Sequence, residues 1–523
     1  MKRILLFLLA ASLSVAALGQ SVAKGYVYED LNGNGRKDRR EKGIRGVAVS
    51  DGENIVTTDE NGRYELPVKD HCVIFVIKPR GYISPVNDDF QTKSYYIHKP
   101  DGSPAYSHEA SSPTGPLPES LDFPMRPYDD PENFKFFAFG DPQPYSLREV
   151  GFFSKAIVEE AKNYDGVSFG ISLGDIAGER PDLYRPYLEA MRGMGIPWYN
   201  VLGNHDRNYD ATEDRLSNET FEATFGPTTH AFRFGNAHFI LLDDILMSDP
   251  PKGKPYVGGL REDQFTFVEN YLKLVNKGEL VILSYHIPIA FKKDQFLDSH
   301  RRRLFKILEG HNVLALSAHS HIQMQFLLGE NLGWTGERPF HEYNVGTTNG
   351  DWYSGKLNDR GLPDATMRDG TPQGYAIVTV ENDKYIFDYK VAGKPADCQM
   401  TVYAPEVIPY KQGGKYPVYV NFYIGENSDV VKFRVDKGEW KKMVRTEEPD
   451  PTFMNLVYEW DRAGHALPGR RSNSVPAVTT HLWKATLDNT LEPGEHVIEI
   501  KAKDMFGRTY TASKTYRTEK YAD

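Results

Sequence analysis

The middle of the chain alternates short apolar runs with amphipathic stretches of helical length. The run "FKFFAFGD", which begins at Phe134, is followed by the helical pattern "SLREVGFFSKAIVEEAKNY", and the same order recurs as far as "VLALSAHSH". Two strand-like runs that turn at Asn382 and Asp383 then predict a hairpin. Such alternation is typical of strands joined by helices in a largely parallel sheet that is covered on both faces. The sequence therefore predicts an α/β domain, which we place at residues 128–395.

Strand-like patterns flank this domain on both sides. Residues 20–127 contain short alternating runs separated by Asn, Gly and Asp, which predict a small Ig-like β-sandwich. Residues 396–523 return to strand-like runs with no helical period, so we expect a second β-rich domain with an irregular insertion at residues 447–478. A chain of 523 residues is too long for one hydrophobic core, which agrees with three domains.

The N-terminus has the order of a secretory signal. Lys2 and Arg3 precede an apolar run at residues 4–11, and small residues follow up to Gly19. A membrane anchor is the alternative, but the apolar run is shorter than the roughly 20 residues that a span requires. We expect residues 1–19 to be cleaved, and the mature protein to be periplasmic or extracellular without a transmembrane segment.

Charge and cysteine content exclude several classes of protein. The formal net charge is -10 and no long Lys/Arg block is present, so general nucleic-acid binding is not expected. The two cysteines, Cys72 and Cys398, are too few for a zinc–thiolate site, so a bound metal must use nitrogen and oxygen ligands. The sequence leaves open whether the two cysteines pair and how many chains assemble.

Polar side chains collect directly after the apolar runs of the middle domain. Open α/β sheets place their ligand-binding crevice there, beyond the carboxyl ends of the strands. One such residue could belong to an ordinary turn, but five runs in one domain each end in a potential metal ligand. Two histidines that are two positions apart can point into one site only if the chain is extended there. The candidates are Asp141, Gln143, Asp175, Asn204, His205, Asp206, His286, His319 and His321.

In order and spacing, the motifs "FGDPQ", "LGDIAGE", "LGNHD", "SYHIP" and "SAHSH" resemble those of the calcineurin-like metallophosphoesterase superfamily over residues 134–393. The resemblance is to an exported bacterial type with β-domains at both ends and D-P-Q in the first motif. It implies a four-layer α/β fold, a β-sandwich flanked by helices, with a small β-sandwich at each end. It also implies two divalent metal ions, the first held by Asp141 and His321, the second by Asn204, His286 and His319, with Asp175 bridging both.

Three positions depart from the family pattern. Gln143 stands where the family usually has a histidine ligand. The second acid of GD-x-x-D is missing at its expected spacing, because Glu179 comes one position late. Ala318 replaces the glycine of GH-x-H. A neutral amide oxygen at Gln143 suits harder ions, so we expect Mn²⁺, Mg²⁺ or Fe as readily as Zn²⁺.

The expected activity is hydrolysis of phosphate mono- or diesters. Two cations about 3.5 to 4 Å apart neutralise phosphoryl oxygens and lower the pKa of a shared water, which supplies the attacking hydroxide. His205 is the expected proton donor to the leaving oxygen, with Asp206 orienting it, and a plain turn residue is the alternative. The rival hypothesis is a surface binding protein for a glycan or protein ligand, whose middle domain has lost catalysis.

Loops that follow the motifs supply candidates for a substrate pocket, namely Tyr145, Asn349, Trp352 and Tyr353. Exposed aromatic rings could stack on a sugar or a base, and burial in the core is an equal alternative. The substrate could be a phosphorylated small molecule, sugar, nucleotide or lipid.

The N-terminal region contains a calcium-loop template. "DLNGNGRKDRRE" fits the pattern D-x-[DN]-x-[DN]-G-x₅-E. A strand-like run precedes it where an EF-hand has a helix, so the loop resembles those of bacterial surface β-sandwich modules. An ordinary Asn-Gly turn is the alternative. The ligands of a structural Ca²⁺ would be Asp30, Asn32, Asn34, Asp38 and Glu41.

Overall fold

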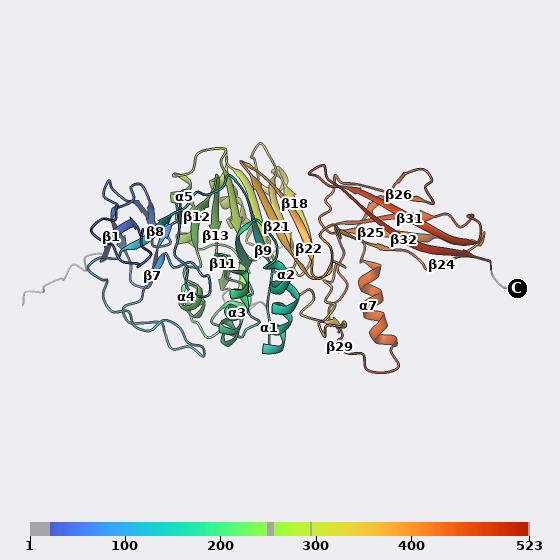
Figure 1. Ribbon diagram of the computed structural model, residues 1–523, viewed down its shortest axis with the longest axis horizontal. Helices are drawn as coiled ribbons and strands as arrows, with labels where there is room; N and C mark the ends of the chain where they lie inside the picture. Colours follow the sequence, from blue (N-terminus) through green and yellow to red (C-terminus); the bar gives the residue numbers. More distant parts are fainter. Residues whose placement is uncertain (1–20, 248–255, 293–294, 521–523) are drawn as a thin grey trace, which may run out of the picture.

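The computed structural model describes residues 21–247, 256–292 and 295–520. Figure 1 shows three β-rich regions in a row along the long axis, with most of the helices on the middle one. The predicted secretory signal at residues 1–19 lies outside the described residues. No helix in the described part of the chain is long and apolar enough to cross a membrane.

Two mixed sheets form the middle region. The first contains, in spatial order, β11 (Trp198–Val201), β10 (Val167–Leu173), β9 (Asn133–Phe139), β21 (Gly374–Glu381) and β22 (Lys384–Val391). The second contains β12 (His230–Phe234), β13 (Ala237–Leu241), β16 (Leu280–Ser284), β17 (Asn312–Ser317), β19 (Phe340–Val345) and β18 (Gln323–Leu328). Strands β9, β10 and β11 run parallel, as do β13, β16, β17 and β19, and the remaining pairings are antiparallel.

The two sheets pack face to face. Phe136 of β9 meets Phe239 of β13 edge-on, with ring centroids 5.2 Å apart. The next residue, Phe137, points the opposite way and joins the core on the helix side. Because successive side chains of a strand alternate between faces, a strand that is buried on both faces must be apolar at nearly every position, as "FKFFAF" is.

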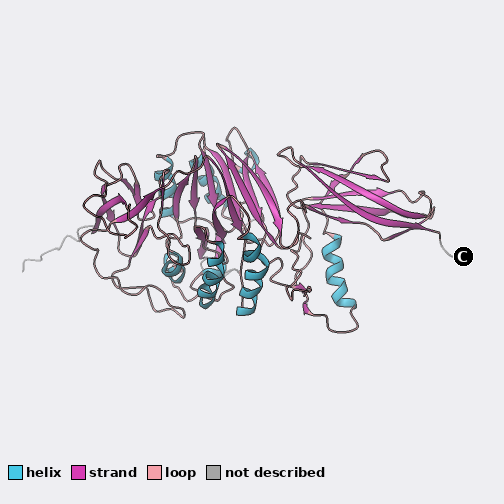
Figure 2. Cartoon of the chain, viewed as in Figure 1, coloured by secondary structure: helices cyan, strands magenta, loops and turns pink. Residues whose placement is uncertain are grey.

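Helices cover the outer face of each sheet (Figure 2). On the first sheet, Phe153 packs against Phe139, with ring centroids 6.3 Å apart. On the second, Phe305 contacts Phe340 at 4.7 Å. The covering helices are α1 (Leu147–Phe153) and α3 (Tyr184–Met191) on the first sheet, and α5 (Glu262–Leu272) and α6 (Asp298–Leu308) on the second. This order of helix, sheet, sheet and helix confirms the predicted four-layer fold.

Short elements complete the middle region. A π-helical turn (Ser154–Val158) continues α1 into α2 (Glu159–Ala161), and α4 (Glu219–Phe225) lies near α3. The 3₁₀ turns are Pro181–Leu183, Arg192–Met194, Asn204–Asp206, Asp214–Leu216 and Glu330–Leu332. Two small ribbons pair β14 (Ile245–Met247) with β15 (Tyr256–Gly258), and β20 (Gly355–Lys356) with β29 (Gly469–Arg470). The predicted hairpin joins β21 to β22 and turns at Asn382, which adopts φ 59°.

The N-terminal region is a sandwich of two four-stranded sheets. One sheet contains β4 (Arg63–Val68), β1 (Ser21–Glu29), β8 (Phe123–Pro127) and β6 (Tyr82–Ile83). The other contains β3 (Ile55–Thr57), β2 (Ala48–Ser50), β5 (Cys72–Ile77) and β7 (Tyr95–His98). Their shared core includes Val27, Leu66 and Ile74. Strands β1 and β8 pair in parallel, whereas the other pairings are antiparallel.

The C-terminal region holds a further pair of sheets. One contains β23 (Met400–Tyr403), β25 (Tyr416–Phe422), β30 (Leu482–Leu487) and β28 (Val444–Thr446). The other contains β24 (Val407–Pro409), β32 (Thr509–Glu519), β31 (Gly494–Lys503), β26 (Val430–Val435) and β27 (Lys441–Lys442). Their core is continuous with the core between the middle sheets, where Phe387 and Phe506 lie 5.0 Å apart.

The insertion at residues 447–478 is not irregular throughout, as the sequence predicted, because it contains α7 (Pro451–Arg462). The Asp450 side chain caps this helix by accepting hydrogen bonds from the backbone N–H groups of Thr452 and Phe453, and a proline occupies the first helical position. Only Phe453 and Val457 of the helix are buried. The apolar residues Phe453, Leu456, Val457 and Trp460 have the i, i+3, i+4, i+7 spacing of an amphipathic helix, so the prediction of an insertion without helical period was wrong.

The calcium-loop template folds as a compact turn after β1. The carboxylate of Asp30 accepts hydrogen bonds from the backbone N–H groups of Gly33, Asn34 and Gly35. The carboxylate of Glu41 accepts from the N–H groups at positions 31 and 38. These bonds are what an Asx-type turn requires on its own, so calcium binding stays a prediction. Cys72 and Cys398 are free thiols.

Candidate metal centre

Five loops bring the predicted ligands to one end of the sandwich. Each loop follows a parallel strand: β9, β10 and β11 of the first sheet, and β16 and β17 of the second. Carboxyl ends of parallel strands meet at one edge, so strands far apart in sequence deliver their next residues to one place. The side chains delivered are Asp141 and Gln143, then Asp175, then Asn204 and His205, then His286, then His319 and His321.

Asp175, His286 and His319 form the centre of the cluster, with one ligand atom from each within 4.8 Å of the others. His286 Nε2 lies 3.3 Å from Asp175 Oδ2, 3.1 Å from His319 Nδ1 and 3.1 Å from Asn204 Oδ1. The other ring nitrogen, Nδ1, donates to the carbonyl of Leu173 at 2.7 Å. Because a carbonyl only accepts, Nδ1 carries a proton in this bond, and Nε2 is the nitrogen left to face the cluster, as in histidines that bind metals.

Two buried oxygens without partners lie on the other side of the cluster. Asp141 is fully buried and Gln143 nearly so, and neither Asp141 Oδ1 nor Gln143 Oε1 has a hydrogen-bond partner in the described structure. His321 Nε2 lies 3.8 Å from Asp141 Oδ1, while its Nδ1 faces the carbonyl of Gly350 at 3.3 Å. Leaving a buried acceptor unpaired costs about 1–3 kcal/mol, so oxygens placed this way fit a cation between them.

The ionisable side chains of the cluster shift one another's pKa values. Burial alone would raise the pKa of Asp175, but the neighbouring His286 and His205 imidazoles outweigh it and lower that pKa. Burial raises the pKa of Asp141, and the nearby Asp175 carboxylate adds to this against the opposing effect of His286. Burial lowers the pKa of His321 to about 3, so this imidazole is a neutral ligand at physiological pH. Burial would lower the pKa of His286, but the Asp175 carboxylate outweighs it and raises that pKa to about 10. Two carboxylates and three imidazoles, with a cation in place of the proton on His286, form a donor set that suits a divalent charge.

The backbone of the cluster lies in the left-handed region. Non-glycine residues avoid this region because of a steric penalty, and concentrations of such residues mark functional sites. His319 and His321 have φ of 62° and 52°, so the chain is not extended between them, contrary to the sequence-based expectation. The two left-handed residues, not a strand, turn both imidazoles into the site. The site residues with positive φ are Asp141, Gln143, Asp175, Glu179, His319, His321, Trp352 and Tyr353.

His205 lies at the open side of the cluster, and its partner differs from the predicted one. Its Nδ1 lies 3.2 Å from Oε1 of Glu179, and its Nε2 lies 4.0 Å from Asp175 Oδ2. Asp206 was expected to orient this imidazole, but its carboxylate instead accepts backbone N–H bonds from Ile176, Ala177 and Gly203, and the hydroxyl of Tyr184. The Asp206 carboxylate therefore joins the loop after β10 to the loop after β11. Glu179 is the acid that lies next to His205.

The candidate pocket residues divide into two groups. Tyr145 is exposed, and its ring faces His205 edge-on at 6.3 Å. Trp352 stacks on His321, with ring centroids 4.0 Å apart. Tyr353 is buried and its hydroxyl donates to the carbonyl of Pro142, so it belongs to the core. Asn349 is also buried, and its amide donates to the carbonyl of Asp141, which supports a ligand loop and does not line a pocket.

Sequence reasoning missed a group of residues beside the second metal position. Arg207 is only 4% exposed, and its guanidinium lies over the rings of Tyr209 and Tyr256, 5.1 and 5.3 Å from their centroids. The Tyr209 hydroxyl donates to the carbonyl of Asn204, and the Tyr256 ring faces that of His319 at 6.2 Å. The position of Arg207 directly after "GNHD" is the one signal that could have drawn attention to it.

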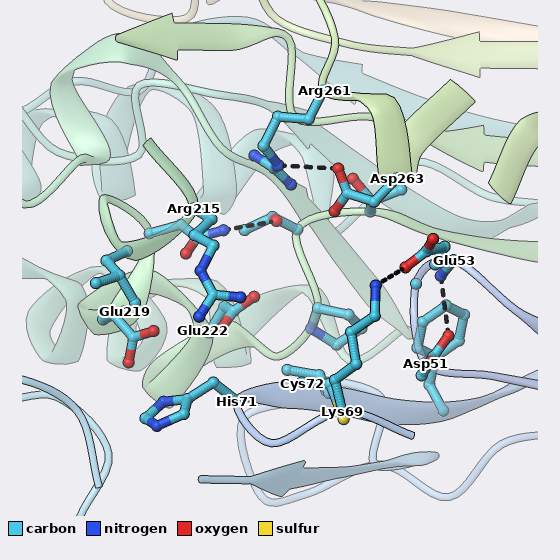
Figure 3. Close-up of a pocket in the computed structure, with 18 residues that line it drawn as sticks. Asp51, Glu53, Lys69, His71, Cys72, Arg215, Glu219, Glu222, Arg261 and Asp263 are labelled. Carbon is cyan, nitrogen blue, oxygen red and sulfur yellow. Dashed lines mark hydrogen bonds and ion pairs between the residues drawn. The ribbon is translucent and has the colours of Figure 1, made fainter. Parts of the chain in front are cut away.

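A separate cavity lies away from this cluster, between the N-terminal sandwich and the middle region (Figure 3). It has a volume of about 290 Å³, and none of the predicted metal ligands lines it. Most of its charged side chains are paired: Lys69 with Glu53 at 2.6 Å, Arg261 with Asp263 at 3.3 Å, and Glu219 and Glu222 with the buried Lys99, each at 2.7 Å. The cavity is therefore a polar seam between two domains.

Comparisons with known proteins agree with the architecture. Residues 31–109 match the model of the N terminal of calcineurin-like phosphoesterase, and residues 342–510 match that of the C terminal of calcineurin-like phosphoesterase. With the four-layer fold between them, these matches support a metallophosphoesterase. Both matched regions are regions of calcineurin-like phosphoesterases, a family that implies a dinuclear metal centre.

Other comparisons add little. None of the curated proteins compared matches the sequence. Among solved structures, the purple acid phosphatase PPD1 from yellow lupin (Lupinus luteus) seeds is similar, with a TM-score of 0.37 and 12% sequence identity. The similarity covers 66% of this chain and 66% of that chain. A likeness at this level carries no argument about function.

Proposed function

We propose that this protein is an exported, metal-dependent phosphoesterase that hydrolyses phosphate mono- or diesters of small molecules. The observation that carries the proposal is the convergence of Asp175, His286 and His319 within 4.8 Å at the ends of three different strands. Export rests on the signal-like sequence of residues 1–19. We divide the mature chain into domains at residues 20–127, 128–395 and 396–523, and assign the reaction to the second.

The proposed ligands form two unequal sets. One set offers an amide oxygen and two imidazoles, and the other offers an imidazole and the two unpartnered oxygens described above. When bound, two divalent cations supply positive charge that neutralises phosphoryl oxygens and makes water more acidic. The first set is Asn204, His286 and His319, the second is Asp141, Gln143 and His321, and Asp175 is shared between them.

Arg207 is the proposed contact for the phosphoryl group. No carboxylate within the described ranges forms an ion pair with its guanidinium, whose Nε donates to the carbonyl of Asn204 at 3.3 Å. A cation that is 96% buried and lacks a counterion is costly, and an anionic substrate would remove this cost. Arginine also matches the spacing of phosphate oxygens better than a lysine does.

His205 is the proposed proton donor to the leaving oxygen. Its imidazole is partly exposed at the mouth of the cluster and 4.0 Å from the shared Asp175, so a substrate held in the cluster can reach it. Glu179 Oε1 lies 3.2 Å from Nδ1 without hydrogen-bond geometry, so its charge alone favours the ring orientation in which Nε2 faces the site.

Aromatic rings around the opening of the metal cluster favour a substrate that contains a ring. Tyr145 and Tyr209 are exposed, and Tyr256 and Trp352 are partly exposed beside His319 and His321. Flat faces of this kind stack on sugars and bases and add affinity without selecting one hydrogen-bonding pattern. We therefore favour a phosphorylated sugar or nucleoside over a phosphorylated protein.

The test is turnover of an aryl phosphate, an aryl phosphodiester and a panel of sugar and nucleoside phosphates by the purified protein, with Mn²⁺, Mg²⁺, Zn²⁺ and Fe²⁺ added separately. We expect Asp175→Asn and His286→Ala to lower turnover by about a thousandfold, because losing a metal removes several kcal/mol of charge stabilisation. Circular dichroism should report an intact fold. Unchanged turnover in either variant overturns the proposal.

The second candidate is a binding protein that has lost catalysis. Gln143, in place of the usual histidine, is the observation that favours it. This hypothesis predicts a protein without bound transition metal that binds glycans or another protein and hydrolyses no phosphate ester. Two equivalents of metal and chelator-sensitive turnover exclude it.

A further inference from the structure

A segment of the C-terminal region reaches the metal cluster from outside the middle domain. Residues 469–481, which we call the strap, leave α7, pair with β20 through β29, and then run on to β30 mostly without regular structure. The Arg470 guanidinium donates to the carbonyl of Trp352 and lies 3.8 Å from Glu149 of α1. Figure 1 shows β29 close to α1 and α7, below the C-terminal sandwich.

The strap supplies hydroxyl donors to a buried carboxylate. Asp351 is 1% exposed and directly precedes Trp352, whose ring stacks on His321. Its Oδ1 accepts from the Ser474 hydroxyl at 2.6 Å, and its Oδ2 accepts from the Ser472 hydroxyl. In the described part of the chain no lysine or arginine pairs with Asp351, so the strap satisfies most of this charge. The loop that carries Trp352 is therefore fixed from the C-terminal region.

The far end of the strap makes a second attachment. His481 is fully buried and its Nε2 lies 3.1 Å from Oδ2 of Asp369. The same oxygen accepts the backbone N–H of Gln323, two residues after His321, at 2.8 Å. Asp369 is itself fully buried, so this bond chain runs from the strap to the loop of the two histidines without contact with water.

Two further bonds tighten the same loop. The backbone N–H of Ala477 donates to the carbonyl of Arg368 at 2.8 Å. The Arg368 guanidinium in turn donates to the carbonyl of Ser320, the residue between His319 and His321. The Asp351 and Asp369 attachments lie next to His321, and the Arg368 attachment lies between the two histidines. The described bonds of His286 involve no strap residue: they run to Leu173, Asp244, Asn204, His319 and the backbone of Ala318.

We infer that the strap is a positioning device for His321, and that the C-terminal region thereby sets the affinity of the Asp141, Gln143 and His321 metal position. The inference rests on the proposed two-metal function. At this position a neutral amide oxygen stands where the family usually has an imidazole, and His321, like His319, is held in a left-handed conformation. A ligand under strain keeps its geometry only when its surroundings hold it, and partners behind metal ligands commonly change metal affinity by about 10–100-fold.

The test compares the full-length wild type with Ser472→Ala/Ser474→Ala, titrated with Mn²⁺ and followed by calorimetry and electron paramagnetic resonance. We expect the wild type to bind two equivalents with the signal of a coupled pair. In the double variant the first equivalent should bind as before, and the second about 10–100-fold more weakly, with the signal of isolated Mn²⁺ at intermediate loading. If the double variant does not fold, the single variant Ser474→Ala, which removes one hydrogen bond, takes its place. Its affinity for the second equivalent should fall by a smaller factor.

Val475→Ala is the matched control, because Val475 lies in the strap but is 79% exposed. It should bind both equivalents as the wild type does. Equal loss of both equivalents in the serine variants, or wild-type binding of both, overturns the role of the strap alone. A wild-type protein that binds fewer than two equivalents overturns the two-metal proposal itself, and the role of the strap with it.

Discussion

The imidazole of His205 faces the carboxylate of Glu179, with Nδ1 and Oε1 3.2 Å apart. Glu179 comes one position after the place at which the family pattern has its second acid, and its left-handed backbone, φ 56°, turns the side chain back toward the site. A displaced acid thus lies beside the group proposed to protonate the leaving oxygen.

We expect Glu179→Gln to lower kcat by about three- to fivefold. Glu179 is 55% exposed, so solvent screens its interaction with His205 to about 0.5–1 kcal/mol. His205→Ala should lower kcat about a hundredfold, because it removes the proton donor. Steady-state kinetics on the double variant provides the check: if Glu179 acts through His205, adding Glu179→Gln to His205→Ala has no further effect. Additive losses would contradict the pairing.

Asp206→Asn should act mainly on the stability of the fold and less on the rate of hydrolysis. The carboxylate accepts three backbone N–H bonds, and an amide in its place presents a donor to at least one of them. We expect the free energy of unfolding to fall by about 2 kcal/mol, measured by urea denaturation of the metal-free protein. Asp182→Asn, at a half-exposed carboxylate that pairs, within the described structure, only with the half-exposed Arg180, serves as the control and should change the free energy of unfolding by less than about 0.5 kcal/mol.

Gln143→His should change which metal the protein selects. An imidazole replaces a neutral oxygen donor, so the second equivalent should shift from Mn²⁺ or Mg²⁺ toward Zn²⁺. Elemental analysis of protein refolded in an equimolar mixture of these ions measures the change. Identical metal content in the two proteins would mean that Gln143 is not a ligand.

Arg207→Gln should raise KM for an aryl phosphate by about 10–100-fold, the value of one charge-assisted hydrogen bond at about 1.5–3 kcal/mol. The two flanking tyrosines should keep the loop in place, so the melting temperature serves as the check on folding. Arg215→Gln is the control, because Arg215 lines the cavity of Figure 3 and is exposed. A KM for Arg207→Gln within twofold of the wild type would exclude a phosphoryl contact.

Local periodicity predicted the α/β domain and the strand ends that carry the candidate ligands, and the family resemblance added the four-layer arrangement. Neither predicted the partner of His205. Glu179 and Asp206 are both acids near a motif, and only the backbone conformation decides which of them faces the imidazole. Arg207 was missed for a related reason, since its burial depends on Tyr256, which is distant in sequence.

The sequence did not predict the strap or its contacts. Ser472, Ser474 and His481 lie in a stretch without periodicity, more than a hundred residues from the aspartates they contact. Hydroxyls and a histidine in such a stretch are typical of any surface loop. Their contacts with the aspartates depend on the pairing of β29 with β20, a tertiary contact that a sequence pattern does not show.

The pairing of β9 has a consequence for the order in which the molecule is built. This strand, which delivers Asp141, is bordered by β10 on one side and by β21 on the other, and β21 follows every ligand loop in the sequence. A nascent chain therefore carries all the ligands before the first sheet can close, and during that interval β9 presents an open edge. The first sheet can therefore close around β9 only after Gly374–Glu381 has been made, and every ligand loop waits for that step.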